Sequence, residues 1–212
     1  MTVWATRHAA EVLACRRCPG VEPPPVLVPI RGRVEVLLVG QAPGPRERDT
    51  GRLFAHTAGT RLFSWFARLG VDEEAFRAKV WISATIRCFP GREVGGDRAP
   101  SPEEVERCAP YLERELARLR PATVIAVGNL AIGRFLDPAP LKDRVGKVFP
   151  VERSFGRWPD DGRPLQRCFF QLVPLPHPSG RSTWFHRLEH QQLLDQALAG
   201  LETTAGWRSA FG

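Results

Sequence analysis

Four of the five cysteines are spaced so that a fold could bring their thiols to one site. Cys15 and Cys18 form a C-x-x-C pair, and Cys88 and Cys108 follow far downstream. An odd number of cysteines in a chain expected to be intracellular argues against a disulfide framework. A redox C-x-x-C pair follows a strand and opens a helix, whereas here a helix is expected before the pair and Pro19 follows it. Metal ligation is therefore the favoured chemistry.

These four cysteines can ligate one metal group only if the segment 88–108 returns to the N-terminus. The segment is rich in proline and glycine, as a long excursion would be. A zinc ribbon uses two C-x-x-C pairs, and the second pair is missing, so we favour a [4Fe–4S] cluster over zinc. Cys168 lies in an apolar run and is expected to be a buried strand residue.

Two loops carry the residues best suited to organic chemistry. Residues 40–44 read G-Q-A-P-G, and residues 177–180 read H-P-S-G. Glycines let a ligand approach the backbone closely, prolines remove flexibility, and neither loop matches a P-loop or a dinucleotide-binding motif. His177, held between prolines on a rigid turn, is suited to polarising a carbonyl group or binding a phosphate. Phe54, shortly after the first loop, is suited to stacking on a flat base.

The elements that must position these residues alternate between strand and helix. Apolar, β-branched runs predict strands at 34–39, 80–83, 123–128 and 168–173, and helices are expected at about 4–14, 58–69, 101–119, 129–136 and 182–201. Residues 137–167 are expected to form an insertion with a hairpin around Gly146. This order predicts an α/β fold, a three-layer α/β/α sandwich with a central four-stranded parallel sheet, in one domain over 1–212. The two loops then open onto the same edge, at the carboxyl ends of the strands.

The charge balance favours a polyanionic partner. Lysine and arginine number 30 against 23 acidic residues, a net charge of +7, and because only three are lysine, 30 − 3 gives 27 arginines. Arginine matches phosphate geometry and stacks on bases, although a GC-rich genome produces the same bias. No run reaches the ~18 apolar residues of a membrane span, and the first residues lack the apolar core of a secretory signal. We therefore expect a cytoplasmic monomer that binds nucleic acid and no membrane.

The loops and cysteines together resemble the uracil-DNA glycosylase superfamily, specifically its bacterial and archaeal iron–sulfur branch, known as families four and five. That branch has a G-E-A-P-G loop after its first strand and then G-R-P-F-V-G-x-A-G, for which residues 51–59 read G-R-L-F-A-H-T-A-G. A strand running into a ligand cysteine is matched by residues 86–88, a C-x-P by residues 108–110, and an H-P-S turn by residues 177–179. The order and spacing agree over nearly the whole chain.

The resemblance implies an enzyme of DNA base-excision repair, which flips uracil out of DNA, hydrolyses its N-glycosidic bond and leaves an abasic site. His177 would stabilise the departing uracil anion by a hydrogen bond to a ring carbonyl oxygen, helped by backbone amides of residues 40–44. The four cysteines would ligate a structural [4Fe–4S] cluster. The base pocket is expected to contain Gly40, Gln41, Ala42, Phe54, Ser83 and Ala84. The DNA contacts are expected to come from Ser179, Arg181 and Arg46.

The first loop departs from the family pattern in its second residue. The usual glutamate of G-E-A-P-G is Gln41, which cannot act as a base but can orient a water or bind the edge of uracil. Glu47 and Asp49 are the nearest carboxylates and are candidates for the missing catalytic group.

A second departure lies where family four has an asparagine that reads the pyrimidine edge. That position is Ala84, as in family five, so discrimination between uracil and cytosine would depend on main-chain groups, Gln41, Ser83 or Thr85. Two alternatives stay open: a glycosylase-like protein that binds damaged or abasic DNA without cleavage or with altered specificity, and a small iron–sulfur or zinc redox protein unrelated to DNA.

Overall fold

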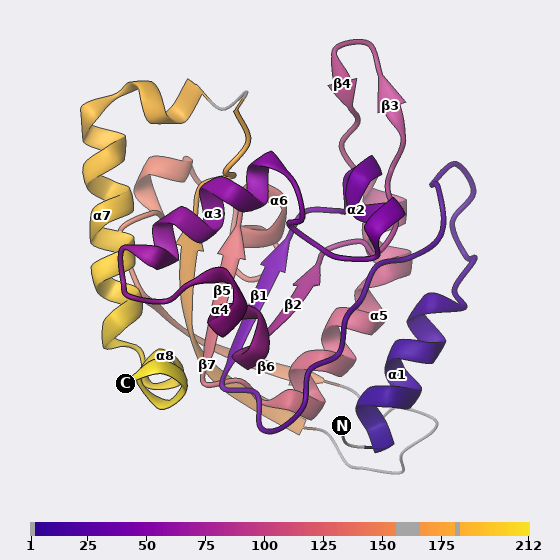
Figure 1. The fold of residues 1–212 in the computed structure, drawn as a ribbon, viewed down its shortest axis with the longest axis horizontal. Helices are drawn as coiled ribbons and strands as arrows, with labels where there is room; N and C mark the ends of the chain where they lie inside the picture. The colour runs from indigo at the N-terminus through magenta and orange to yellow at the C-terminus, as the bar shows by residue number, and fades with distance from the viewer. Residues whose placement is uncertain (1–2, 156–165, 181–182) are drawn as a thin grey trace.

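A computed structural model describes residues 3–155, 166–180 and 183–212. Its centre is a five-stranded sheet of order β2-β1-β5-β7-β6 (Figure 1). The strands are β1 (Val36–Gly40), β2 (Val80–Ala84), β5 (Thr123–Val127), β6 (Phe149–Phe155) and β7 (Gln166–Leu175). β2, β1, β5 and β7 are parallel to one another, and β6 is antiparallel to β7. The predicted α/β sandwich with four parallel strands is confirmed, and the edge strand β6 is an addition to it.

The segment 137–167 differs from the hairpin that was expected around Gly146. Its described part contains a short 3₁₀ helix, Leu141–Asp143, and then β6, whose antiparallel partner is β7. Gly146 has φ +90° and packs against α7, where a Cβ atom would lie 3.2 Å from the Cδ2 of Leu193. The predicted hairpin is therefore wrong, because this turn docks on a helix instead of joining two strands. The connection between β6 and β7, residues 156–165, lies outside the described residues.

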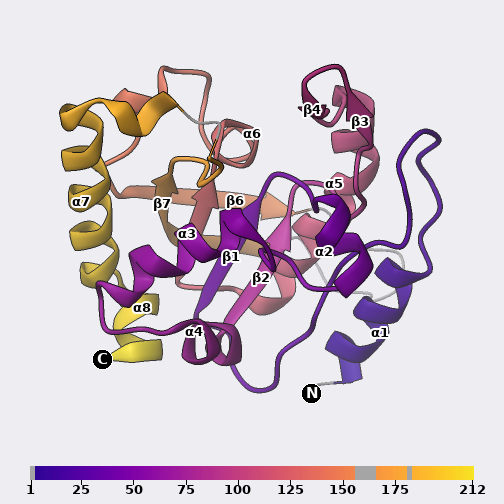
Figure 2. The same cartoon turned by 45° about the horizontal axis from the view of Figure 1, so that its top comes forward.

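Helices cover both faces of the sheet (Figures 1 and 2). One face, here called the α3/α4 face, packs against α3 (Thr57–Ala67), α4 (Glu73–Lys79), α7 (Leu188–Thr203) and α8 (Ala205–Phe211). The other, the α1/α5 face, packs against α1 (Val3–Leu13), α5 (Pro102–Leu119) and α6 (Asn129–Ile132). Because both faces are covered, β1 and β5 are fully buried and, apart from Thr123, apolar, as in other parallel sheets.

Helix boundaries follow their capping residues. The hydroxyl of Ser101 accepts from the N–H of Glu104, and the Glu104 carboxylate accepts from the N–H of Ser101 at 2.8 Å, which starts α5 at Pro102 as predicted. α4 was not predicted, although Asp72 caps it by accepting from the N–H of Ala75 at 2.7 Å. No helix among the described residues is both long and apolar enough to span a membrane.

Several shorter elements lie at the carboxyl edge of the sheet. α2 (Pro45–Thr50), which was not expected, forms directly after the loop 40–44. A small hairpin of β3 (Arg92–Glu93) and β4 (Gly96–Asp97) rises from the segment between Cys88 and α5 (Figure 1). The expected last helix, 182–201, begins later, with α7 at Leu188 after a 3₁₀ turn at Thr183–His186. The candidate site is thus framed by loops after β1, β2, β5 and β7.

Candidate active site and thiol cavity

His177 follows β7 in a turn at the carboxyl edge of the sheet. The backbone N–H of Ser179 donates a hydrogen bond to Nδ1 of His177 at 3.3 Å. An Nδ1 that accepts a hydrogen bond leaves the ring proton on Nε2, so the neutral imidazole presents Nε2–H as a donor. Burial lowers the pKa of His177 below its ordinary value of 6.5, which favours this neutral form. The turn therefore holds a neutral hydrogen-bond donor, which is suited to stabilising a developing oxygen anion.

Gly128, at the end of β5, forms the surface on which the His177 ring packs. A Cβ atom at Gly128 would lie 3.3 Å from both Cβ and Cδ2 of His177, and its φ of +87° is in the region that favours glycine. The N–H of Gly128 donates to the carbonyl of Leu175 at 2.9 Å. Neighbouring strands β5 and β7 thus jointly fix the position of the imidazole.

The loop 40–44 is tied to the segment after β2 through its carbonyl groups. The Gly40 carbonyl accepts from the backbone N–H of Thr85 at 2.9 Å and from its hydroxyl at 3.1 Å. The Gln41 carbonyl accepts from the N–H of Ile86 at 3.2 Å. Gln41 and Ala42 are half-buried. The loop is therefore positioned by β1 and β2 together.

Phe54 lies directly against this loop. A Cβ atom on Gly40 would be 2.8 Å from Cζ of Phe54, so the ring packs on the glycine backbone. Gly40 is the register partner of Ala84 on β2, and Phe54 and Ala84 share the hydrophobic cluster of the α3/α4 face. A Cβ atom on Gly59 would lie 1.8 Å from the Phe54 carbonyl oxygen, which explains the glycine there. The structure thus brings Gly40, Phe54 and Ala84 together.

The two carboxylates near the loop have different surroundings. Glu47 accepts from the N–H of Gly44 at 2.6 Å and also hydrogen-bonds the backbone of Phe54 and Ala55. Burial raises the pKa of Glu47 despite these bonds. Asp49 is exposed and pairs with Arg48, whose Nε donates to it at 2.8 Å. Only Glu47 therefore touches the candidate site, and its carboxylate is occupied by backbone donors.

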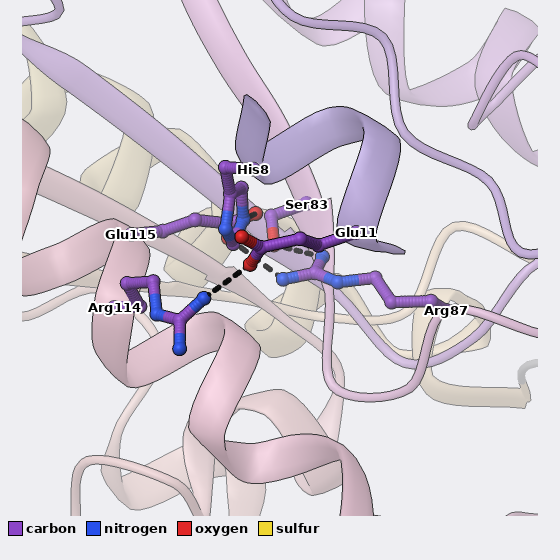
Figure 3. Close-up of polar contacts among 6 residues, drawn as sticks. All are labelled: His8, Glu11, Ser83, Arg87, Arg114 and Glu115. Carbon is purple, nitrogen blue, oxygen red and sulfur yellow. Dashed lines mark hydrogen bonds and ion pairs between the residues drawn. The ribbon is translucent and has the colours of Figure 1, made fainter. Parts of the chain in front are cut away.

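Ser83 points away from Phe54, to the α1/α5 face. Its hydroxyl donates to Glu115 at 2.7 Å and accepts from Arg87. The Glu115 carboxylate also hydrogen-bonds Nε2 of His8 at 3.1 Å and accepts from Arg87 at 2.7 Å, as Figure 3 shows. This fully buried ionic network engages the Ser83 side chain, so any part that Ser83 plays in base binding is limited to its backbone.

The candidate DNA contacts lie around the same edge. The Ser179 carbonyl accepts from Arg61 of α3 at 3.1 Å, and the Arg61 guanidinium lies 5.6 Å from the ring centroid of Phe185. Arg46 is exposed on α2. Arg181 lies outside the described residues. Arg61, which the sequence analysis did not single out, therefore connects α3 to the turn that carries His177.

The four cysteines that were predicted as ligands line one cavity. Cys15, Cys18, Cys88 and Cys108 surround a space of about 260 Å³ together with arginine side chains and Tyr111. Burial, helped by the other three sulfurs, raises the pKa of Cys88 to about 12. Among the described residues, no three His, Cys, Asp or Glu side chains are arranged to hold a single metal ion. The segment 88–108 thus returns to the N-terminal C-x-x-C pair, as predicted.

Cys168 is separate from these four. It is 2% exposed within β7 and belongs to the hydrophobic cluster of the α1/α5 face. Its predicted place as a buried strand cysteine is confirmed.

The model of a family described as the uracil DNA glycosylase superfamily matches residues 29–202. The chain belongs to this superfamily. A type-4 uracil-DNA glycosylase of Archaeoglobus fulgidus is 34% identical over 150 residues, which cover 68% of this chain and 71% of the relative. A type-4 enzyme of Pyrobaculum aerophilum is 37% identical over 119 residues, 55% of this chain and 57% of the relative. A type-5 enzyme of the same organism is 31% identical over 107 residues, 45% of each chain.

The site of this glycosylase-superfamily member contains residues that the sequence analysis missed. Gly128 supports the imidazole, and Arg77 of α4 donates to the carbonyls of Leu53 and Phe54. A local signal for α4 was present, since acidic residues 72–74 precede basic side chains one turn later, as a helix dipole favours. Nothing local in the sequence indicated that α4 contacts the turn of Phe54.

Proposed function

We propose that this chain is a monofunctional uracil-DNA glycosylase of base-excision repair. It flips uracil out of DNA, hydrolyses the N-glycosidic bond and leaves an abasic site. The observation that carries the proposal is the convergence of His177, the loop 40–44 and Phe54 at one sheet edge. The superfamily match and the named relatives support the same activity.

His177 is proposed to stabilise the leaving group. As the bond between C1′ and N1 breaks, negative charge develops on uracil and its carbonyl oxygens. A neutral imidazole with its proton on Nε2 donates to such an oxygen, and the backbone bond from Ser179 keeps the ring in that tautomer. A lowered pKa supports this role, because the ring stays a neutral donor at physiological pH.

Gln41 is proposed to orient the water that attacks the sugar. The sugar acquires oxocarbenium character, helped by nearby DNA phosphates, and water adds to C1′ while the uracil anion takes up a proton. Gln41 is half-buried next to Gly40, and its amide can hold a water without accepting its proton. Glu47 is less suited to this step, because its carboxylate already accepts from backbone N–H groups.

Base selection is proposed to depend on the main chain and Gln41. The methyl group of Ala84 offers no hydrogen bond at the position where family four reads the pyrimidine edge. Losing a bidentate contact of that kind costs roughly 1–3 kcal/mol of base discrimination. We therefore expect a broader base range than uracil alone, which a screen of uracil, thymine mismatches, hypoxanthine and xanthine would measure.

We propose that Cys15, Cys18, Cys88 and Cys108 hold a [4Fe–4S] cluster. The shared cavity, lined by these four thiols and by arginine side chains, supports the proposed cluster. Four thiolates close together repel one another, so they ionise only where positive charge from a metal group or from arginines is near. When bound, the cluster supplies covalent cross-links between the N-terminal segment and α5. The proposed hydrolysis of the glycosidic bond transfers no electrons, so the cluster is proposed to be structural.

The cluster is tested by metal content and colour. Purified protein is expected to contain iron and sulfide and to absorb broadly near ~400 nm, as thiolate-to-iron charge transfer does. Cys108→Ser should lose iron, whereas Cys168→Ser, a matched change at a buried cysteine of β7, should retain it. Colourless protein with stoichiometric zinc would overturn the cluster in favour of zinc.

The activity is tested with single- and double-stranded oligonucleotides that contain one uracil. We expect conversion to an alkali-labile abasic site, and intact substrate under all conditions would refute the proposal. Gln41 and Ala84 favour one alternative, a non-cleaving binder of damaged DNA. Tight, salt-sensitive binding to an abasic duplex without turnover on any base would support that alternative. A cytoplasmic monomer remains our prediction for location and assembly.

A further inference from the structure

Phe54 occupies a backbone conformation that is rare for its residue type. Its φ is +55°, in the left-handed region that bulky side chains seldom adopt. The side chain is 8% exposed, and its ring rests on the backbone of Gly40. A turn of this kind persists only when its surroundings hold it in place, and such turns cluster at functional sites.

Arg77 holds the carbonyl side of this turn. Its Nη1 donates to the carbonyl of Leu53 and its Nη2 to the carbonyl of Phe54, both at 2.9 Å. One planar guanidinium therefore binds two successive peptide groups through two nitrogens held in a fixed geometry, which the single nitrogen of lysine does not provide. Arg77 is itself fixed by Glu73, which accepts from its Nε at 2.8 Å, and by the ring of Phe63, whose centroid lies 4.6 Å away.

Glu47 holds the N–H side of the same turn. Its carboxylate hydrogen-bonds the backbone of Phe54 and Ala55 and accepts from the N–H of Gly44. The carboxylate thus connects the turn to the loop 40–44, and Gly59 leaves room for the Phe54 carbonyl. The positively charged Arg77 therefore binds the carbonyl groups of the turn, and the negatively charged Glu47 binds its N–H groups.

We propose that Arg77 is a positioning residue for base recognition, which together with Glu47 holds the Phe54 turn so that its ring lies where a flipped base stacks. This inference rests on the proposed glycosylase function. Without the guanidinium, the carbonyls of Leu53 and Phe54 lose their donor, and the turn relaxes to a negative φ. The ring then leaves Gly40, and the flipped base loses its stacking partner.

The inference is tested by a double-mutant cycle of Arg77→Ala and Phe54→Ala. The measured quantity is kcat/KM on a uracil-containing oligonucleotide. In the wild-type background Arg77→Ala should lower kcat/KM by about tenfold, whereas in the Phe54→Ala background it should lower it by less than about twofold, as residues acting through one another are non-additive. Arg77→Lys should lower kcat/KM in the same background-dependent way, because a single ammonium nitrogen does not reproduce the planar two-nitrogen geometry of the guanidinium.

Controls separate positioning from a general loss of structure. Arg68→Ala, at the C-cap of neighbouring α3, removes an exposed pair with Asp195 and should leave kcat/KM and Tm at wild-type values. All variants are assayed well below their measured Tm. If Arg77→Ala does not fold, Arg77→Lys carries the same cycle, since it keeps the charge and the helix propensity.

The outcomes distinguish this inference from the proposed function. Wild-type protein that leaves the oligonucleotide intact would overturn the proposed function and this inference with it. An active wild type with equal losses in both backgrounds, or an Arg77→Ala variant of wild-type activity, would overturn the inference alone.

Discussion

Two arginines, Arg87 and Arg77, lie on opposite faces of the same sheet and bind very different partners. Arg87 is 2% exposed and binds the fully buried carboxylate of Glu115 and the hydroxyl of Ser83. Arg77 binds two backbone carbonyls and Glu73, whose side chain is 42% exposed. The first arginine acts within a network that joins α1, β2 and α5, and the second connects α4 to a single turn.

The difference indicates which property each region controls. A buried ion whose partner is removed stays in a low-dielectric interior without compensation, so the Arg87 network should control stability. Arg77 sets the conformation of a turn next to the proposed base pocket, so its region should control activity. This difference between the Arg87 network and the Arg77 region is tested by variants for which both the free energy of unfolding and the cleavage rate are measured.

The largest effect is expected for Glu115→Ala, which leaves Arg87 buried without its counter-ion. The free energy of unfolding should fall by about 3–5 kcal/mol, measured by chemical denaturation. Glu11→Ala is the matched control, since Glu11 pairs with Arg114 between the same two helices and its side chain is 38% exposed (Figure 3). It should cost no more than about 1 kcal/mol. Equal losses for the two variants would contradict the distinction.

A similar effect, on activity alone, is expected for His177→Ala. Removing the proposed donor to the departing uracil should slow single-turnover cleavage by about 10²–10³-fold, as for other oxyanion donors. Tm and affinity for an abasic duplex should change little, and His177→Gln, which keeps a donor, should lose less. If cleavage and binding fall equally, the histidine has a structural role instead.

A smaller, mixed effect is expected for Gly59→Ala on the α3/α4 face. The added Cβ would lie 1.8 Å from the Phe54 carbonyl, so the turn must shift. Overpacking of this kind costs about 1–3 kcal/mol of stability, and kcat/KM should fall as the ring is displaced. Gly200→Ala, inside α7, meets only one methyl group of Val148 and should stay within about 1 kcal/mol of wild type. Unchanged activity in Gly59→Ala would weaken the role of the turn.

The smallest effect concerns pH. Because burial lowers the pKa of His177 below 6.5, the unfolded chain binds a proton at this residue before the folded protein does. The free energy of unfolding should therefore fall as the pH drops below 6.5 and stop falling, for this residue, below the lowered folded pKa. Denaturation of wild type and His177→Gln between about pH 5 and 8 measures the difference. Identical pH slopes would rule out a depressed pKa.

The core of the fold could be predicted because its strands are continuous apolar runs. The four parallel strands and the capped start of α5 carry strong local signals. α2 and α4 were missed because they are short and polar, and their stability comes from contacts with the rest of the protein. β6 was missed because its residues are mostly half-exposed and its partner β7 lies beyond residues 156–165.

The cysteine set, the two loops at one sheet edge and the family that they resemble could all be read from the amino-acid sequence. Such features are local runs and ordered motifs, so they need no knowledge of distant contacts. By contrast, the three-dimensional fold was needed to show that Ser83 faces a buried ionic network and that Glu47 binds backbone N–H groups. The fold also showed that Arg77 donates to the carbonyl of Phe54. These contacts could not be predicted because strand register sets the face of the sheet on which a side chain lies, and its hydrogen-bond partners come from elements far apart in the chain.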